Sequence, residues 1–101
     1  MDGFSIDGLD EVIHGRVRLG IMAFLSTAGE AEFSGLRDRL QLTDGNLSVH
    51  LRKLEEAGYV RIDKRFVGKK PNTRVVLAEE GRAAFRRYLE TVAALVEGSR
   101  S

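Results

Sequence analysis

The sequence predicts a mostly helical α+β fold: a helix, a short strand, two closely spaced helices, a two-stranded hairpin and a C-terminal helix. Apolar residues recur at helical spacing in most of the chain, whereas the segment 59–77 alternates and contains a turn. The chain has 101 residues and shows no linker, repeat or low-complexity segment. This length suits one domain over residues 1–101.

The first helix is expected over residues 9–28. Asp7 is its candidate N-cap and Gly29 its stop. Gly15 and Gly20 would then lie inside the helix, where each costs roughly 1 kcal/mol relative to Ala if it is exposed. The apolar face of this helix contains Leu9, Val12, Ile13, Val17, Ile21, Phe24 and Leu25.

Residues 30–33 are expected to form a short strand that needs a partner. Ser34 is a candidate N-cap for a short helix that carries Leu36 and Leu40 on one face. Thr43 is the candidate N-cap of the next helix, over about residues 44–57. This third helix directs its leucines inward, and Gly58 supplies the position after its end. The inward leucines are Leu47, Leu51 and Leu54.

Residues 59–77 are expected to form the hairpin, with turn chemistry at residues 68–72. The first strand has Val60, Ile62 and Phe66 as its apolar members. Phe66, like Tyr59, is expected to pack in the core or against the hairpin. The last helix is expected over residues 79–97, with Ala84, Tyr88 and Leu95 beside an apolar stripe of Phe85, Leu89, Val92 and Val96.

Composition excludes several classes of function. The chain has no Cys, which removes disulfides, thiolate metal sites and cysteine nucleophiles. Its two histidines, His14 and His50, have no carboxylate at ligand spacing, so no metal or other cofactor is expected. His50 is instead interpreted as a packing or phosphate-contacting residue. No nucleophile–base pair or phosphate loop is present, and no apolar run approaches the roughly 20 residues of a membrane span. We therefore expect a soluble, cytoplasmic protein that is not an enzyme.

Charge is concentrated in the middle of the chain. Residues 1–36 carry two basic and six acidic residues, residues 37–74 carry ten basic and five acidic ones, and residues 75–101 carry four of each. A neutral chain with this distribution favours a polyanionic partner. Patches of charge on helical surfaces are also common without any partner, so that alternative stays open.

The third helix has an unusual outer face. With its leucines directed inward, a rotation of 100° per residue places Gly45, Val49 and Arg52 opposite them, flanked by Asn46, Ser48 and Lys53. Two helices joined by so short a connection cross steeply, as in a helix-turn-helix. Asn can form hydrogen bonds to adenine, Arg can form hydrogen bonds to guanine, and Val can contact a thymine methyl. A solvated helix that contacts nothing is the alternative.

The hairpin carries Lys64, Arg65, Lys69, Lys70 and Arg74 within eleven residues. A ribbon with a cationic tip suits a phosphate backbone or a minor groove. A pair of lysines in a turn is weak evidence for nucleic-acid binding by itself, because exposed loops favour lysine for solubility.

Four segments resemble the MarR/ArsR-like winged-helix transcriptional regulators of bacteria and archaea, in the region of about residues 9–89. The segment 42–60 resembles their recognition helix and the entry to the first wing strand. Residues 64–73 resemble the wing, 77–82 the start of the last helix, and 18–22 part of the first helix. Ala78 departs from the pattern, because the family usually has a Thr there that caps the last helix.

This resemblance implies a winged helix-turn-helix fold and sequence-specific binding of double-stranded DNA by a homodimer. It implies base contacts from Asn46, Ser48, Val49 and Arg52 in the major groove. Phosphate contacts are implied for Ser34, Thr43, Lys53 and the wing cations Lys64, Arg65, Lys69, Lys70 and Arg74. The family often senses a small-molecule effector, but nothing in this sequence indicates one.

The terminal helices, 9–28 and 79–97, are predicted to form the dimer interface. Their apolar stripes extend beyond what a small core covers, and a symmetric pair would hold two recognition helices about one DNA turn, roughly 34 Å, apart. The candidate interface residues are Leu9, Val12, Ile13, Phe85, Leu89, Val92 and Val96. The alternative is that the last helix folds back on its own domain.

Two other functions compete with this prediction. The domain could be a protein-interaction module whose third helix and wing bind an acidic partner. It could also be a chromatin-like protein that coats DNA without sequence preference, although the polar face with Asn46 and Val49 argues against that.

Overall fold

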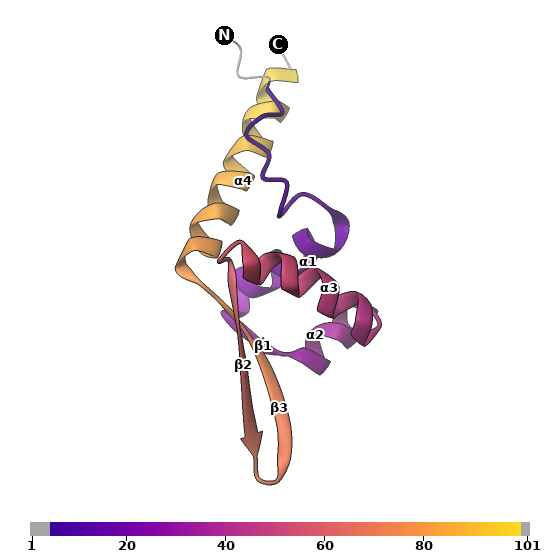
Figure 1. Ribbon diagram of the computed structural model, residues 1–101. Coiled ribbons are helices and arrows are strands. Elements are labelled where there is room, and N and C mark those ends of the chain that lie inside the picture. The colour runs from indigo at the N-terminus through magenta and orange to yellow at the C-terminus, as the bar shows by residue number, and fades with distance from the viewer. Residues whose placement is uncertain (1–4, 100–101) are drawn as a thin grey trace.

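The computed structural model describes residues 5–99, and Figure 1 shows its helices and strands. The predicted single domain of residues 1–101 therefore includes six terminal residues that lie outside this range. The observed order of elements confirms the predicted mostly helical α+β fold and its winged-helix arrangement. The elements are α1 (Arg16–Ala28), β1 (Glu30–Glu32), α2 (Phe33–Leu40), α3 (Asp44–Glu56), β2 (Val60–Val67), β3 (Lys70–Leu77) and α4 (Glu79–Ser99).

The strands form an antiparallel sheet in the order β1-β3-β2. The short strand β1 pairs only with residues 74–76 of β3, whereas β2 and β3 pair along their whole length, from Val60 with Leu77 to Val67 with Lys70. The turn is shorter than predicted, because Pro71 and Asn72 belong to β3. Gly68 adopts a φ of 66°, and this conformation allows a tight two-residue connection.

The first helix begins at Arg16 and not at residue 9, so its predicted start and the Asp7 cap are wrong. The Asp10 carboxylate accepts hydrogen bonds from the backbone N–H groups of Val12 (2.8 Å) and Ile13 (3.2 Å). Such local side-chain bonds stabilise a turn in place of a helix. Gly15 precedes the helix with a φ of 153°, which residues with side chains rarely adopt.

Around the helix pair, one predicted cap is wrong and one is confirmed. The strand β1 leads directly into α2, whose N-cap is Glu32, so Ser34 lies inside the helix. The Thr43 hydroxyl accepts a hydrogen bond from the backbone N–H of Asn46 at 3.1 Å, as an N-cap should. After α3, Gly58 has a φ of 81°, in agreement with its predicted position beyond the helix end.

The core is one cluster that joins every helix to the sheet. The helix α4 contributes Ala84, Phe85 and Tyr88, whereas Leu89 of the predicted stripe is 50% exposed. A close contact fixes which side of α4 faces the core: a Cβ on Gly81 would lie only 2.1 Å from the carbonyl oxygen of Tyr59. The fully buried large residues are Ile13, Ile21, Met22, Leu25, Leu36, Leu47, Leu54 and Val75.

The segment before α1 lies along α4 (Figure 1). His14 lies in this segment, because α1 begins only at Arg16, and its predicted place in the first helix is wrong. Its Nδ1 is 2.8 Å from the Tyr88 hydroxyl of α4. The Tyr59 hydroxyl donates a hydrogen bond to the Asp10 carboxylate, and burial together with this bond raises the pKa of Tyr59 to about 12. None of the helices in residues 5–99 has the length and apolar character that a bilayer span requires.

Candidate nucleic-acid interface

Helix α3 has one buried and one exposed face, as predicted. Leu47, Leu51 and Leu54 are in the core. The opposite side exposes a set of short polar, apolar and basic side chains, and Val49 among them is 52% exposed. An exposed valine surrounded by hydrogen-bonding groups leaves this face chemically suited to base edges. The exposed residues are Asn46, Ser48, Val49, Arg52 and Lys53.

The start of α3 is tied to α2 by ion pairs. Arg37 contacts Asp38 and Asp44, each at 2.8 Å. These hydrogen bonds raise the pKa of the Arg37 guanidinium and lower that of the Asp38 carboxyl. Asp44 stabilises the positive end of the α3 dipole, and Arg37 compensates its charge beside the exposed face.

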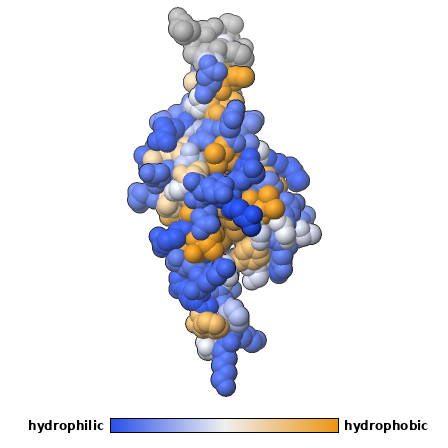
Figure 2. Space-filling model, viewed as in Figure 1, coloured by the Kyte–Doolittle hydropathy of each residue, from blue (hydrophilic) through white to orange (hydrophobic). Residues whose placement is uncertain are grey.

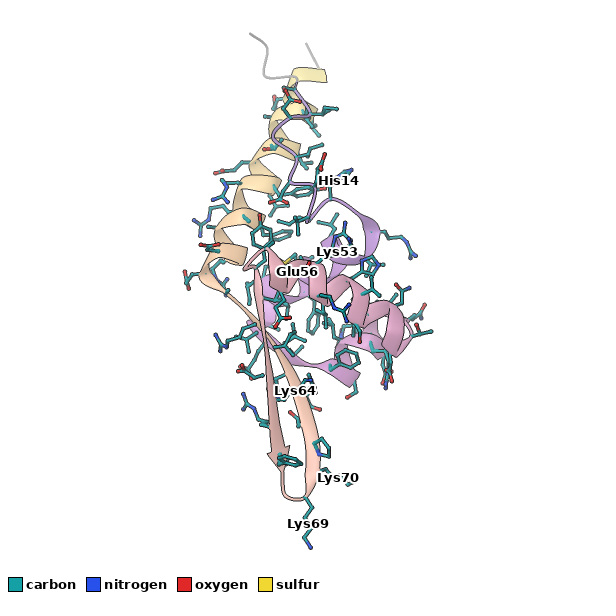
Figure 3. All side chains as sticks on the ribbon, viewed as in Figure 1. His14, Lys53, Glu56, Lys64, Lys69 and Lys70 are labelled. Carbon is teal, nitrogen blue, oxygen red and sulfur yellow. The ribbon has the colours of Figure 1, made fainter. Side chains whose placement is uncertain are left out.

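The hairpin extends away from the core with its cations exposed. Figure 3 shows Lys69 and Lys70 at its free end and Lys64 midway along it. Arg65 is exposed as well, but its guanidinium lies 3.5 Å from Asp63. That carboxylate also binds Arg61 at 3.0 Å, and these interactions lower the pKa of Asp63. The hairpin therefore presents exposed positive charge at Lys64, Lys69 and Lys70, whereas Arg61 and Arg65 share the carboxylate of Asp63.

Arg74 differs from the other predicted wing cations. Its guanidinium lies 2.7 Å from Glu30 and 3.7 Å from Glu32, both on the neighbouring strand β1. Arg74, which was predicted to contact DNA, thus forms cross-strand ion pairs. Sequence reasoning missed these partners because they lie more than forty residues away in the chain.

A cleft of about 690 Å³ separates the exposed face of α3 from the hairpin. It brings together Ser48 and Arg52 of α3 with Lys64 of β2, three residues for which the resemblance implies contacts with DNA. Two carboxylates, those of Asp44 and Glu55, lie at the same cleft. The remaining lining residues are Phe33, Leu51, Ile62 and Thr73.

The structure places Lys53, Ser34 and Thr43, three other predicted phosphate contacts, away from this cleft. Lys53 lies beside Arg18 and Glu56 at a separate depression, on the side of α3 that faces the segment before α1 (Figure 3). Ser34 is exposed in the first turn of α2. Thr43 is exposed, although its hydroxyl already caps α3.

His50 connects α3 to α1. Its Nδ1 lies 3.0 Å from a guanidinium nitrogen of Arg18. Burial, followed by the positive charges of Arg18 and Lys53, lowers the pKa of His50. The histidine therefore has a packing role, one of the two that the sequence suggested. In the part of the chain that the structure describes, no three His, Asp or Glu side chains are grouped as a metal site.

The candidate dimer residues fall into three groups. Ile13 is fully buried and Phe85 is 7% exposed, so both belong to the chain's own core. Leu9, Val12 and Val92 pack partly against that core. Leu89 and Val96 on α4 are 50% and 52% exposed.

The fold and this surface define a winged helix with a candidate DNA-binding face. Residues 17–96 match the family model of the winged helix DNA-binding domain. The chain belongs to this family, which is a family of DNA-binding domains and not of enzymes.

Two archaeal proteins are similar over most of their length. The chain is 38% identical to the uncharacterized protein MJ0432 of Methanocaldococcus jannaschii over 79 residues, which is 78% of this chain and 86% of the relative. It is 36% identical to the transcriptional regulator homologue protein from Pyrococcus horikoshii OT3, with a TM-score of 0.83 over 89% of both chains.

The structural likeness extends to MarR-family regulators. AbsC, a MarR family transcriptional regulator from Streptomyces coelicolor, superposes with a TM-score of 0.64 at 23% identity. The match covers 77% of this chain and 54% of AbsC. At this identity the likeness concerns the fold, and it agrees with the MarR-like resemblance of the sequence.

Proposed function

We propose that this protein is a sequence-specific transcriptional regulator that binds double-stranded DNA as a homodimer in the cytoplasm. Helix α3 enters the major groove, and the hairpin lies on the adjacent backbone or minor groove. The observation that carries this proposal is the cleft where Ser48 and Arg52 of α3 lie across from Lys64 of the hairpin. One surface thus combines groups that read bases with groups that bind phosphates.

The base-reading role falls to the exposed face of α3. Arg52 has the geometry for two hydrogen bonds to guanine, Asn46 for two to adenine, and Val49 for contact with a thymine methyl. Ser48 bonds to either kind of base edge. All four side chains are exposed and belong to a helix whose start is capped by Thr43.

The phosphate-binding role falls to the exposed cations and hydroxyls around that face. Arg74 is left out of this set, because its ion pairs with Glu30 and Glu32 use its charge to hold β1 on the hairpin. The proposed phosphate contacts are Ser34, Thr43, Lys53, Lys64, Arg65, Lys69 and Lys70.

Helix α4 provides the proposed dimer interface. Leu89 and Val96 are half exposed on one side of the helix, and α4 extends from the core at the end opposite to the hairpin (Figure 1). Burial of both side chains against a second copy would remove apolar surface from water and leave the hairpins and α3 helices accessible. The name of the P. horikoshii relative, a transcriptional regulator homologue, supports the regulatory part of the proposal.

Selection of bound fragments from random duplex DNA at physiological salt tests this function. Enrichment of an inverted repeat is the expected result, because a two-fold dimer reads two half-sites in opposite directions. Binding without enrichment would replace the proposal with a DNA-coating role. No binding at any sequence would favour the protein-interaction module.

A further inference from the structure

Two large apolar side chains are exposed at the free end of the hairpin. Phe66 is 71% exposed and Val67 is 64% exposed, and neither packs against the core. Of the two alternatives expected for Phe66, packing in the core is therefore wrong. The reason is that the hairpin extends beyond the core, and none of the hydrophobic residues of 64–73 belongs to the core cluster or packs against it.

The surroundings of these side chains are strongly basic. The hairpin carries six basic residues, of which Arg61 and Arg65 share Asp63 and Arg74 pairs with Glu30 and Glu32 of β1. Lys69 and Lys70 lie at its free end (Figure 3). Figure 2 shows apolar surface among hydrophilic side chains towards the free end of this hairpin. Charge complementarity therefore selects a polyanion as the partner of the hairpin end.

Phosphate binding alone needs no exposed phenylalanine. In proteins that bind the minor groove, apolar side chains next to phosphate-binding cations enter between base pairs and partly unstack them. Phe66 is opposite Pro71, and Val67 is opposite Lys70. The two-residue turn and the fixed φ of Pro71 hold this end in one conformation, which a wedge requires.

We propose that Phe66 is a wedge that inserts at one base step of the minor groove while Lys69 and Lys70 bind the flanking phosphates. This inference rests on the proposed DNA-binding function. It predicts a preference for flexible pyrimidine–purine steps at a position that α3 does not contact, because those steps unstack most easily.

Fluorescence of 2-aminopurine, placed in turn at each position beside the selected half-site, tests the wedge directly. The base brightens when it loses its stacking neighbour, so the wild type is expected to brighten it at one step. Phe66→Ala should abolish this signal and weaken binding about tenfold with an unchanged salt slope, since no charge is lost. Phe66→Leu should restore most of the signal, because leucine also acts as a wedge.

Two matched variants separate the wedge from charge and from general apolar exposure. Lys70→Ala should keep the fluorescence signal but reduce the salt slope by about 0.9. Ile6→Ala removes an exposed apolar side chain outside the hairpin, 68% exposed, and should change neither quantity. Phe66 lies outside the core, so its variants are expected to fold.

The outcomes distinguish the wedge from the function on which it depends. If the wild type binds no duplex, the proposed function fails and the wedge fails with it. If the wild type binds but Phe66→Ala keeps both signal and affinity, the wedge alone is overturned. If Phe66→Ala instead reduces self-association or binding to anionic lipid vesicles, the hairpin end docks elsewhere and the wedge is likewise overturned.

Discussion

Arg18 of α1 donates a hydrogen bond to Nδ1 of His50 at 3.0 Å, at the middle of the helix proposed to read DNA. A guanidinium can only donate, so Nδ1 accepts and the imidazole is neutral. Arg18 also donates through Nε to the carbonyl oxygen of Val12 at 2.5 Å. One side chain thus links α3 to the segment that precedes α1.

Burial of His50, together with the positive charges of Arg18 and Lys53, makes folding stability depend on pH. The pKa of His50 is lowered below its ordinary value of 6.5, so below about pH 6.5 the unfolded chain takes up a proton more readily than the folded one. Stability should therefore fall as the pH drops from 6.5 towards the lowered value. His50→Asn keeps an acceptor near Nδ1 without a titrating group. Urea unfolding at about pH 7 and about pH 5 should show a smaller loss for this variant, and an equal loss would contradict the assignment.

Base-reading and phosphate-binding residues should differ in how they affect affinity. Arg52→Ala should reduce the discrimination between the selected site and a scrambled one by about 1–3 kcal/mol. Lys70→Ala should weaken both sites equally and reduce the salt slope by about 0.9. Dissociation constants measured for both duplexes over a range of salt concentrations test these roles. Equal losses for both variants on every duplex would show that the roles are wrongly divided.

Gly81 is a position where a methyl group should destabilise the fold. A Cβ there would lie 2.1 Å from the carbonyl oxygen of Tyr59 and 2.9 Å from its carbonyl carbon, and these backbone atoms cannot move aside as the end of a flexible side chain can. We expect Gly81→Ala to lose about 2 kcal/mol or more, despite the better helix propensity of alanine. Gly35→Ala in α2, where nothing lies within 4 Å, is the control and should gain up to about 1 kcal/mol. Denaturant titration compares the two variants, and a stable Gly81→Ala protein would disprove the contact.

The proposed dimer depends on the exposed apolar side of α4. Leu89→Lys places a charge in that interface and should shift the protein to a monomer, since an unpaired buried charge is costly. Glu90→Lys introduces the same side chain at the neighbouring exposed position and should leave the dimer intact. Sedimentation velocity at matched concentrations, with circular dichroism to verify folding, measures the difference. A wild type that is monomeric at high micromolar concentration would refute the interface.

Local signals predicted the parts of this fold that depend on neighbouring residues. Thr43 before α3 and Gly58 after it mark their helix ends because capping needs only a few residues. The predicted start of α1 is wrong, because the helical spacing of Leu9 and Val12 does not reveal that the Asp10 side chain bonds to the backbone there.

Features that depend on contacts between residues far apart in the chain could not be predicted from the sequence. In the sequence Arg74 cannot be distinguished from the other hairpin cations, because only the folded sheet brings Glu30 beside it. The exposure of Phe66 depends on how far the hairpin extends beyond the core, and alternation along β2 carries no information about that. The cleft between α3 and the hairpin likewise exists only once both elements are packed.

The two-residue turn at Gly68 and Lys69 restricts how the length of this hairpin can change. Because side chains alternate between the two faces of a strand, one residue inserted in β2 before Phe66 would turn Phe66 to the opposite face. A change that adds two residues to each strand would preserve the facing of every side chain and extend the ribbon by about 7 Å. Natural variants of this hairpin should therefore differ in length by even steps, and its reach from the core can change without altering which side chains it presents.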